Sequence, residues 1–322
     1  MVDIAKFLKS HVYLILAIIV LVFISSMVAA NLTVDGDEIA NLEVSRNIFR
    51  GYHTETVYAQ WKFWHHPPLY YFLIYPLRFS FLYARMFSIA ISCMIVILLY
   101  KMGGGKAQLL YVLIPTVLIF SAVVRPDILM LLFMFLTLFL VEKHPKLALL
   151  VSILGINTKY QYAAVLLPIL LVDKRKFVKF VVTDFLAILP FGLVSYAYSG
   201  DFLMLGHWTA GIEILSFTEL MPTDLMLIYM FLVAAIASLK INDSRRYLAL
   251  SIANLLLVSV TSPAKFAYKV TYYYLPVFAS GCLATEELFG RVGKYWRYVL
   301  LFIFLAIVSR QSRFLFDILL KP

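Results

Sequence analysis

Two short segments near the amino terminus carry side chains that could do chemistry. Residues 35–38 read Asp-Gly-Asp-Glu and follow a long apolar segment, and residues 65–71 read His-His-Pro-Pro-Leu-Tyr-Tyr. A carboxylate at a lipid boundary can deprotonate an incoming hydroxyl as a general base, and a neighbouring carboxylate can hold a divalent cation or a sugar hydroxyl. The two segments together therefore suggest chemistry at a membrane surface. The alternative interpretation is an acidic loop that is simply solvated.

Basic residues recur where the outer ends of the predicted helices should converge. They are Arg85, Arg125, Lys159, Lys265 and Lys269. Ionisable groups at membrane depth are costly, so a function is the first hypothesis for each of them. The alternative for any single residue is a long side chain that extends its charged end to the membrane surface.

The composition predicts a membrane protein built from helices. Apolar residues make up 63% of the chain and charged residues 14%, with a mean hydropathy of +0.90, far outside the range of soluble globular domains. The apolar stretches are long runs rather than short alternating strands, which excludes a β-barrel. Cys93 and Cys282 lie within apolar runs and predict no disulfide framework. The first apolar run is long enough for an uncleaved anchor.

The apolar runs predict about eleven crossings, several of them shorter than the roughly 20 residues that span a bilayer. They lie near residues 12–30, 83–100, 109–124, 128–141, 146–156, 163–172, 177–198, 225–239, 247–260, 272–284 and 298–308. Residues 157–162 could instead interrupt one broken helix. If the chain instead crosses the membrane twice, once before and once after residues 157–162, both basic segments, 143–146 and 173–176, lie in the cytoplasm. The charge bias of membrane proteins therefore favours two crossings.

The same charge bias predicts the orientation and location of the chain. The amino terminus is expected in the cytoplasm, the protein in the plasma membrane as an integral multi-pass protein, and Lys159 on the outer side. The net charge of +10 is then mostly an orientation signal. Since no basic face outside lipid is evident, we expect no nucleic-acid partner.

Residues 1–322 are predicted to form a single transmembrane domain with two long outer loops. The first outer loop, residues 31–82, holds the candidate site, and the second, residues 199–224, could be a lid, an acceptor contact or a packing loop. Within the first loop, a mixed pattern at residues 39–50 predicts an amphipathic helix on the membrane. Residues 67–81 are apolar but short, and predict a helix in the outer interface rather than a crossing.

These segments resemble the C-type glycosyltransferase superfamily, which includes protein O-mannosyltransferases and the aminoarabinose transferase acting on lipid A. Residues 35–38 with Arg46 and Gly51 resemble its first outer loop, and residues 66–71 resemble its histidine-proline-proline-leucine element. The likeness runs over most of the chain, and the order and spacing of its weak motifs make it fairly specific. Further matches are Arg85 in residues 83–88, residues 125–127, Lys159 in residues 157–160, and residues 273–276.

The resemblance implies transfer of a sugar from a polyprenyl-phosphate donor to a lipid, glycan or protein acceptor, with inversion, on the outer face. Asp37 would be the general base, with Asp35 and Glu38 shaping the site or assisting with a cation. The developing charge of the leaving phosphate would be met by Arg85, Lys159, Arg125, Lys265 and Lys269. The expected substrate-lining residues are His65, His66, Tyr70, Asp127, Tyr273 and Tyr274. The tyrosines at 272–274 could equally form an interfacial aromatic belt.

A metal is a secondary expectation. Imidazole with carboxylates can hold Zn²⁺, and carboxylates alone suit Mg²⁺ or Mn²⁺. The candidate ligands are Glu38, His66 and His207, and their spacing is not diagnostic. We also expect the chain to lack the extramembrane domain that larger members of this superfamily append at the carboxyl end, so the identity of the acceptor stays open.

Two other functions fit parts of the sequence. A transporter or flippase of a lipid-linked or anionic substrate would use membrane Arg and Lys to bind phosphate without breaking bonds. It predicts inverted repeats and broken helices near the midplane, and no repeat is evident in the sequence. A non-catalytic membrane scaffold predicts instead that the acidic cluster tolerates substitution.

Overall fold

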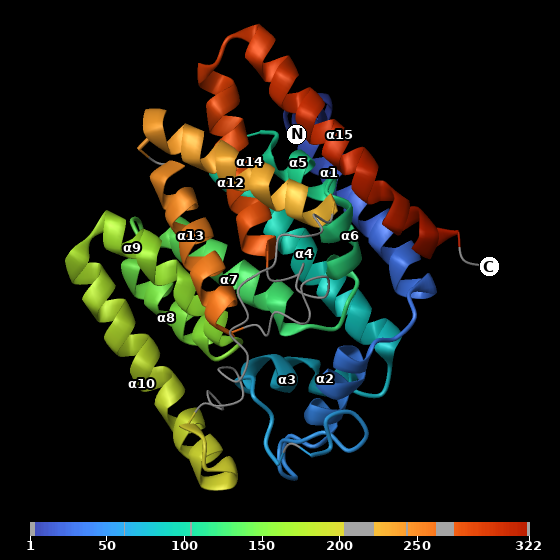
Figure 1. Cartoon of the computed structure of the whole chain (residues 1–322), viewed down its shortest axis with the longest axis vertical. Coiled ribbons are helices and arrows are strands. Elements are labelled where there is room, and N and C mark those ends of the chain that lie inside the picture. The colour runs from blue at the N-terminus through green and yellow to red at the C-terminus, as the bar shows by residue number, and fades with distance from the viewer. Residues whose placement is uncertain are drawn as a thin grey trace.

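The computed structural model describes residues 4–60, 62–103, 105–202, 222–242, 244–261 and 274–320 (Figure 1). Every regular element in these residues is a helix, which confirms the all-α prediction for the described part of the chain. The helices are α1 (Ile4–Asn31), α2 (Gly36–Arg46), α3 (Leu69–Ile74), η1 (Tyr75–Leu77), α4 (Phe81–Gly103), α5 (Ala107–Val112), α6 (Pro115–Ser121), α7 (Pro126–Leu140), α8 (Pro145–Ile156), η2 (Tyr160–Val165), α9 (Leu166–Val172), α10 (Lys174–Ser199), α12 (Pro222–Lys240), α13 (Ser244–Thr261), α14 (Leu275–Arg291) and α15 (Lys294–Leu319).

Four of the described helices are long and apolar enough to cross a membrane. They are His11–Asn31 within α1, together with α4, α10 and α15. A bent pair, α6 with α7, would make a fifth if the two form one span. Shorter apolar helices are Pro145–Ile156, Tyr160–Val172 and Leu225–Leu239. The structure therefore supports four to five candidate spans, and the finer prediction of eleven stays a prediction.

Proline divides the segment that was predicted to cross at residues 109–124. Ile114 is extended, with ψ of 114°, and α6 begins at Pro115. Pro lacks an N–H and disfavours the helical conformation of the residue before it, so α5 has to end there. Pro126 likewise opens α7, and the axes of α6 and α7 meet at 111°. The single predicted crossing is thus two short helices followed by a sharp bend.

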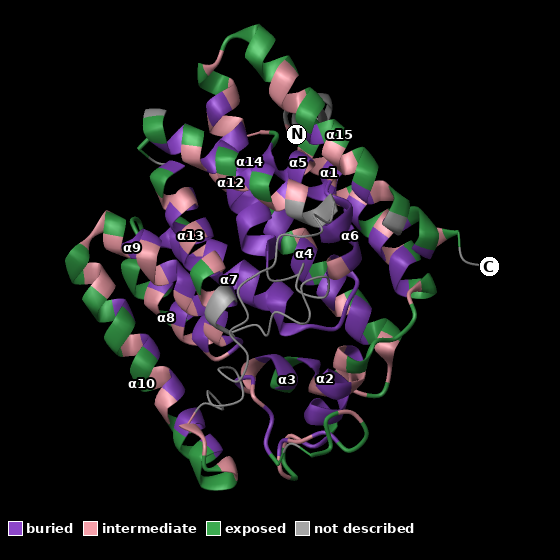
Figure 2. Ribbon diagram, in the orientation of Figure 1, coloured by how far each residue is buried: buried purple, intermediate pink, exposed green. Residues whose placement is uncertain are grey.

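Helices α7 and α14 are mostly buried, α7 against α4 and α8 and α14 against α12 and α13, whereas Figure 2 shows that α10 and α15 expose much of their length. Gly281 lets α14 approach α12, because a Cβ there would lie 2.6 Å from the Met230 side chain. Large apolar side chains are exposed on the two outer helices, among them Phe185 and Phe302. A continuous apolar surface of this kind suits contact with lipid.

Residues 31–82 contain α2, α3 and η1, of which α2 departs from the prediction while α3 agrees with it. Helix α2 overlaps the predicted amphipathic segment 39–50 but begins earlier, at Gly36, and its polar residues Asn41, Glu43 and Ser45 are buried along with the apolar ones. The helix is therefore packed inside the protein on several sides and presents no continuous polar face. Helix α3, in the segment 67–81, has six residues and is too short to cross a membrane, as predicted.

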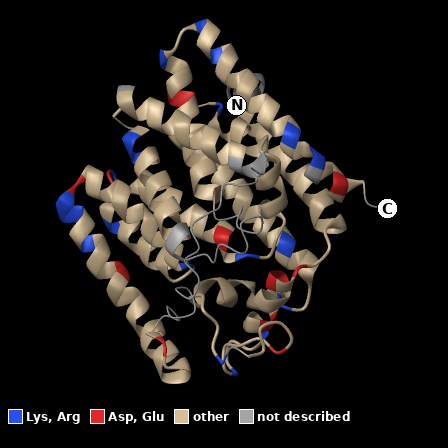
Figure 3. Ribbon diagram, in the orientation of Figure 1, with Lys and Arg blue, Asp and Glu red and all other residues tan. Residues whose placement is uncertain are grey.

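The charged loops gather at two ends of the molecule. The first outer loop joins the break before η2 through a hydrogen bond from the Leu69 N–H to the Asn157 carbonyl, 3.0 Å. At the other end Lys176 Nζ donates to the Val141 carbonyl, 3.1 Å. Figure 3 shows further Lys and Arg at the start of α10 and around the α14–α15 turn.

Candidate functional site

Helix α2 begins with a reciprocal cap that positions all three carboxylates. Asp35 is the N-cap residue, and its Oδ1 accepts the Glu38 N–H at 2.7 Å. Glu38 Oε2 in turn accepts the Asp35 N–H at 3.4 Å. An Asp followed three residues later by Glu is the sequence pattern of such a capping box. The acidic segment is therefore the start of a helix, not a solvated loop.

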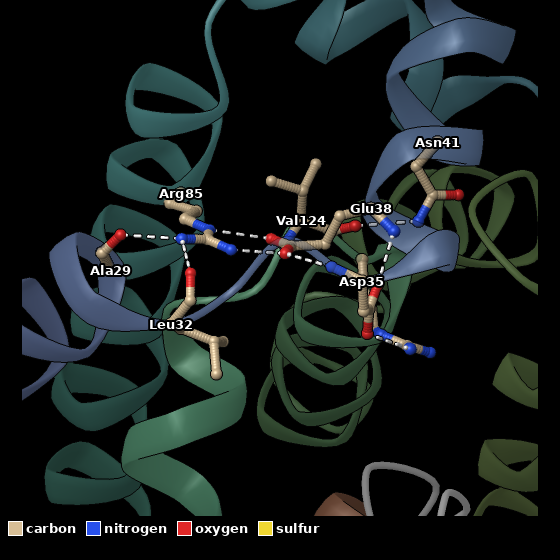
Figure 4. Close-up of polar contacts among 8 residues, drawn as sticks. Ala29, Leu32, Asp35, Glu38, Asn41, Arg85 and Val124 are labelled. Atoms are coloured by element: carbon tan, nitrogen blue, oxygen red, sulfur yellow. Dashed lines mark hydrogen bonds and ion pairs between the residues drawn. The ribbon is translucent and has the colours of Figure 1, made fainter. Parts of the chain in front are cut away.

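Glu38 and Arg85 form a completely buried ion pair (Figure 4). Arg85 Nε donates to Glu38 Oε1 at 2.9 Å, and Nη2 donates to Oε2 at 2.5 Å. Arg85 Nη1 also donates to the carbonyls of Ala29 and Leu32, at 2.8 and 2.9 Å. The Val124 N–H completes the cluster by donating to Glu38 Oε1 at 3.0 Å. A buried pair is stable only when its remaining donors and acceptors are satisfied, as they are here.

This geometry changes the roles expected of Glu38 and Arg85. Each carboxylate oxygen already faces the guanidinium, and a metal ion at Glu38 would meet that positive charge at contact distance. A donor phosphate at Arg85 would have to displace Glu38 or two backbone carbonyls. The contacts between Glu38 and Arg85 therefore do not fit the expected catalytic and metal-binding roles of Glu38 or the expected phosphate-binding role of Arg85. The pair instead ties the end of α1 to α2, α4 and the segment before α7.

Arg125 gathers the other two carboxylates. Its Nη2 lies 3.0 Å from Asp35 Oδ2 and 2.6 Å from Asp37 Oδ2. Asp37 Oδ1 also accepts a hydrogen bond from the Tyr58 hydroxyl at 3.0 Å. The Asp37 side chain is 36% exposed, whereas that of Arg125 is 10% exposed. Asp37 is thus held from two sides while part of it faces outward.

Tyr58 reaches Asp37 from a strained backbone. Its φ is +57°, in the left-handed region that residues with a side chain seldom adopt. Such a conformation costs roughly 1–3 kcal/mol and gathers at functional sites. No sequence pattern pointed to Tyr58, because the contact depends on how the loop 47–68 folds back over α2.

Lys159 and Asp127 form a second buried ion pair directly beside Arg125. Lys159 Nζ lies 2.6 Å from Asp127 Oδ1, and both side chains are almost fully buried. Arg125 is the N-cap residue of α7, which brings Asp127 into the first helical turn. The charges of Arg125 and Asp37 both act on Lys159. Five of the predicted charged residues therefore form one group, which we call the Asp37 cluster: Asp35, Asp37, Arg125, Asp127 and Lys159.

His65 and His66 lie against this cluster. Their ring centroids are 4.0 Å apart, and His66 is buried. Burial lowers the pKa of His66 well below its usual 6.5, and the positive charges of His65, Lys159 and Arg125 lower it further. His66 is therefore neutral at pH 7 and contributes hydrogen-bonding groups rather than a cation.

Buried aromatic side chains hold the histidine segment onto α2. The Trp64 indole N–H donates to the Tyr71 hydroxyl, which donates to Asn41 Oδ1 at 3.0 Å. The Asn41 amide donates to the Val124 carbonyl at 2.8 Å. Tyr70, predicted to line the substrate, is fully buried, and burial raises the pKa of its hydroxyl. The sequence analysis did not single out Trp64 or Asn41, and it included Tyr71 in the histidine-proline segment without predicting a role for it.

The remaining predicted site residues lie elsewhere. Tyr274 is buried at the N-cap of α14. Outside the described residues are His207, Lys265, Lys269 and Tyr273, as is most of the second outer loop. The part of the chain that the structure describes contains no group of three or more His, Cys, Asp or Glu side chains arranged to hold a metal ion.

Comparison of the chain with models of known protein families, with curated proteins and with solved structures finds no match. The resemblance to C-type glycosyltransferases therefore rests on the sequence motifs. What those motifs imply has to be argued from the cluster itself.

Proposed function

We propose that this protein is a membrane glycosyltransferase that moves a sugar from a polyprenyl-phosphate donor to an acceptor hydroxyl, with Asp37 as the general base. The observation that carries the proposal is the environment of Asp37: partly exposed, held by Arg125 and Tyr58, and beside the buried cation Lys159. A base must reach an incoming hydroxyl and keep a fixed orientation, and Asp37 meets both conditions. Asp35 is less available as a base, because one of its oxygens accepts the hydrogen bond that caps α2.

The reaction transfers one proton to Asp37 and replaces the sugar–phosphate bond with a bond from the sugar to the acceptor oxygen. Asp37 accepts the acceptor's hydroxyl proton while the oxygen attacks the anomeric carbon from the face opposite the phosphate. The bond from the anomeric carbon to the phosphate oxygen breaks, and free polyprenyl phosphate leaves with its electron pair. Arg125 has five N–H donors, enough to hold two carboxylates and also meet the leaving phosphate. Lys159, whose ammonium group is paired with Asp127, lies beside Arg125.

The finer topology belongs to the same proposal. We infer eleven crossings in a plasma membrane, in which polar flanks complete the shorter helices, with the amino terminus inside and the cluster on the outer face. The donor lipid and the cluster then share one leaflet. The acceptor is a lipid, glycan or protein on that side.

A turnover assay tests this function directly. Purified protein receives polyprenyl-phosphate sugars with mannose, glucose or aminoarabinose heads and a membrane lipid extract, and release of free polyprenyl phosphate is followed. We expect release by the wild type and a loss of about 10²-fold or more in Asp37→Asn, the scale for removal of a general base. Asp317→Asn, an exposed aspartate on α15, is the matched control. Equal release by wild type and Asp37→Asn would remove Asp37 from catalysis.

A transporter or flippase of a lipid-linked or anionic substrate is the second candidate. The observation that favours it is the 111° bend between α6 and α7, immediately before Arg125, because broken helices mark the binding sites of many transporters. This function predicts movement of the lipid across vesicle membranes with no release of polyprenyl phosphate. If Asp37→Asn equals the wild type in both the polyprenyl-phosphate release assay and the vesicle assay, a non-catalytic membrane scaffold is favoured instead.

A further inference from the structure

A charged cavity lies at the far end of α7 from the Asp37 cluster. It has a volume of about 380 Å³ and is lined by Met102, Leu138, Glu142, Lys143, Arg246, Tyr247 and Glu287. We call it the α13 pocket, after the helix that begins beside it. Helix α7 has 15 residues, so at 1.5 Å per residue about 22 Å of helix separates the two sites. The pocket is on the end predicted to face the cytoplasm.

The α13 pocket brings together two cations and two carboxylates from three elements. Arg246 Nη2 and Glu142 Oε1 form an ion pair at 2.5 Å, and both side chains remain partly exposed. The Ser244 hydroxyl donates to Glu287 Oε2, which anchors one side of that carboxylate. Lys143 makes no ion pair within the described residues and lines the same cavity. Tyr247 and Leu138 supply buried walls.

We propose that the α13 pocket binds the headgroup of an ethanolamine phospholipid. Lys143 and Arg246 match the phosphate, because ammonium and guanidinium groups make strong charge-assisted hydrogen bonds to phosphate oxygens. Glu287 and Glu142 match the ligand's ammonium group. An anionic headgroup without an amine would still meet Lys143 and Arg246, but it would offer no positive charge to Glu142 and Glu287, which repel its phosphate. The balance of charges therefore selects a zwitterion over a simple anion.

The size and surroundings of the cavity fit a lipid. Pockets that bind small molecules begin at about 300 Å³, so a phosphoethanolamine group fits while the acyl chains stay outside. Helix α4 exposes Met94 and Ile97 within about two turns of Met102. Phe139 is exposed on α7 next to Leu138. Met94, Ile97 and Phe139 are thus exposed apolar side chains on two of the helices that line the pocket.

Native mass spectrometry of the full chain in detergent tests the assignment. Phosphatidylethanolamine, phosphatidylglycerol and N-acetylated phosphatidylethanolamine with matched acyl chains are titrated separately. We expect phosphatidylethanolamine to bind about tenfold more tightly than either other lipid, the scale of one charged hydrogen bond. Only the lipid varies in this comparison, so it does not depend on how a variant folds. Equal binding of the three lipids would overturn the proposal.

Variants then locate the binding. Lys143→Gln should weaken phosphatidylethanolamine binding about tenfold, and Glu287→Gln should remove its preference over phosphatidylglycerol. Glu287→Gln keeps an oxygen that can accept the Ser244 hydroxyl hydrogen bond. Lys179→Gln, an exposed lysine on α10, is the control and should change nothing. An unchanged preference in Glu287→Gln would place the lipid elsewhere and overturn the assignment.

A competition experiment separates the lipid from its free headgroup. Soluble glycerophosphoethanolamine should displace the lipid only weakly if the apolar surface of α4 contributes. Displacement at concentrations equal to those of the lipid would show that the pocket takes a water-soluble zwitterion, and that outcome would overturn the lipid assignment.

Discussion

Asp37 and Arg125 lie 2.6 Å apart, carboxylate oxygen to guanidinium nitrogen, although 88 positions separate them in the chain. The same Arg125 nitrogen lies 3.0 Å from Asp35. One guanidinium therefore sets the direction of the proposed base relative to the helix cap. The arrangement makes the planar shape of arginine important as well as its charge.

Arg125→Lys should reduce turnover about tenfold or more while leaving the fold intact. Lysine keeps the positive charge but cannot contact two carboxylates and a phosphate through one planar group. Turnover at saturating donor is the measurement, with Arg175→Lys on the exposed start of α10 as the control. Wild-type turnover in Arg125→Lys would mean that only charge matters at this position.

Arg85→Ala should destabilise the protein by about 3–5 kcal/mol, since it leaves the fully buried carboxylate of Glu38 without its partner. Thermal unfolding in detergent measures the loss. The double variant Glu38→Leu with Arg85→Met should regain much of it, because a buried pair can be replaced by apolar side chains at little cost. If Arg85 binds the donor phosphate instead, Arg85→Ala will unfold normally and raise the KM for the donor.

Stability should fall as the pH is lowered below about 6.5, and His66 should account for part of this loss. Its pKa is lowered in the folded protein, mainly by burial, so below pH 6.5 the unfolded chain binds a proton that the folded chain does not. Each pH unit in that window costs about 1.4 kcal/mol until the folded pKa is reached. His66→Gln should show a shallower acid loss, and His144→Gln, at an exposed histidine, should not. Identical acid profiles for His66→Gln and the wild type would contradict the assignment.

Ser152→Ala should destabilise the packing of α10 by about 1–3 kcal/mol. The Ser152 hydroxyl donates to Asp184 Oδ1 at 2.6 Å, and both side chains are buried between α8 and α10. Removing the hydroxyl leaves a buried carboxyl group without this donor. Ser312→Ala is the control, because the Ser312 hydroxyl bonds only to the Val308 carbonyl of its own helix. An unchanged melting temperature in Ser152→Ala would show that Asp184 has another partner.

The amino-acid sequence by itself determined that the chain is helical and apolar, and where several helices begin. Long apolar runs can satisfy their backbone groups in lipid only as helices. The start of α7 was predicted at residues 125–127, because proline is favoured in the first helical turn. The capping pattern of Asp35 and Glu38 also lies in the sequence, but it was interpreted as an acidic cluster and the helix was predicted at residues 39–50 instead. The charged residues that form the Asp37 cluster were also visible from their positions at predicted helix ends.

Only the tertiary structure decided which of these charges face each other. Asp37 and Glu38 are neighbours, yet each step along a helix turns the side chain by about 100°, so one reaches outward and the other enters the interior. Arg85 and Arg125 looked equivalent in the sequence, but Arg85 meets Glu38 from 47 positions away and Arg125 meets Asp35 from 90. Pairing over such separations depends on how α1, α2, α4 and α7 pack, and no local pattern in the sequence carries that information.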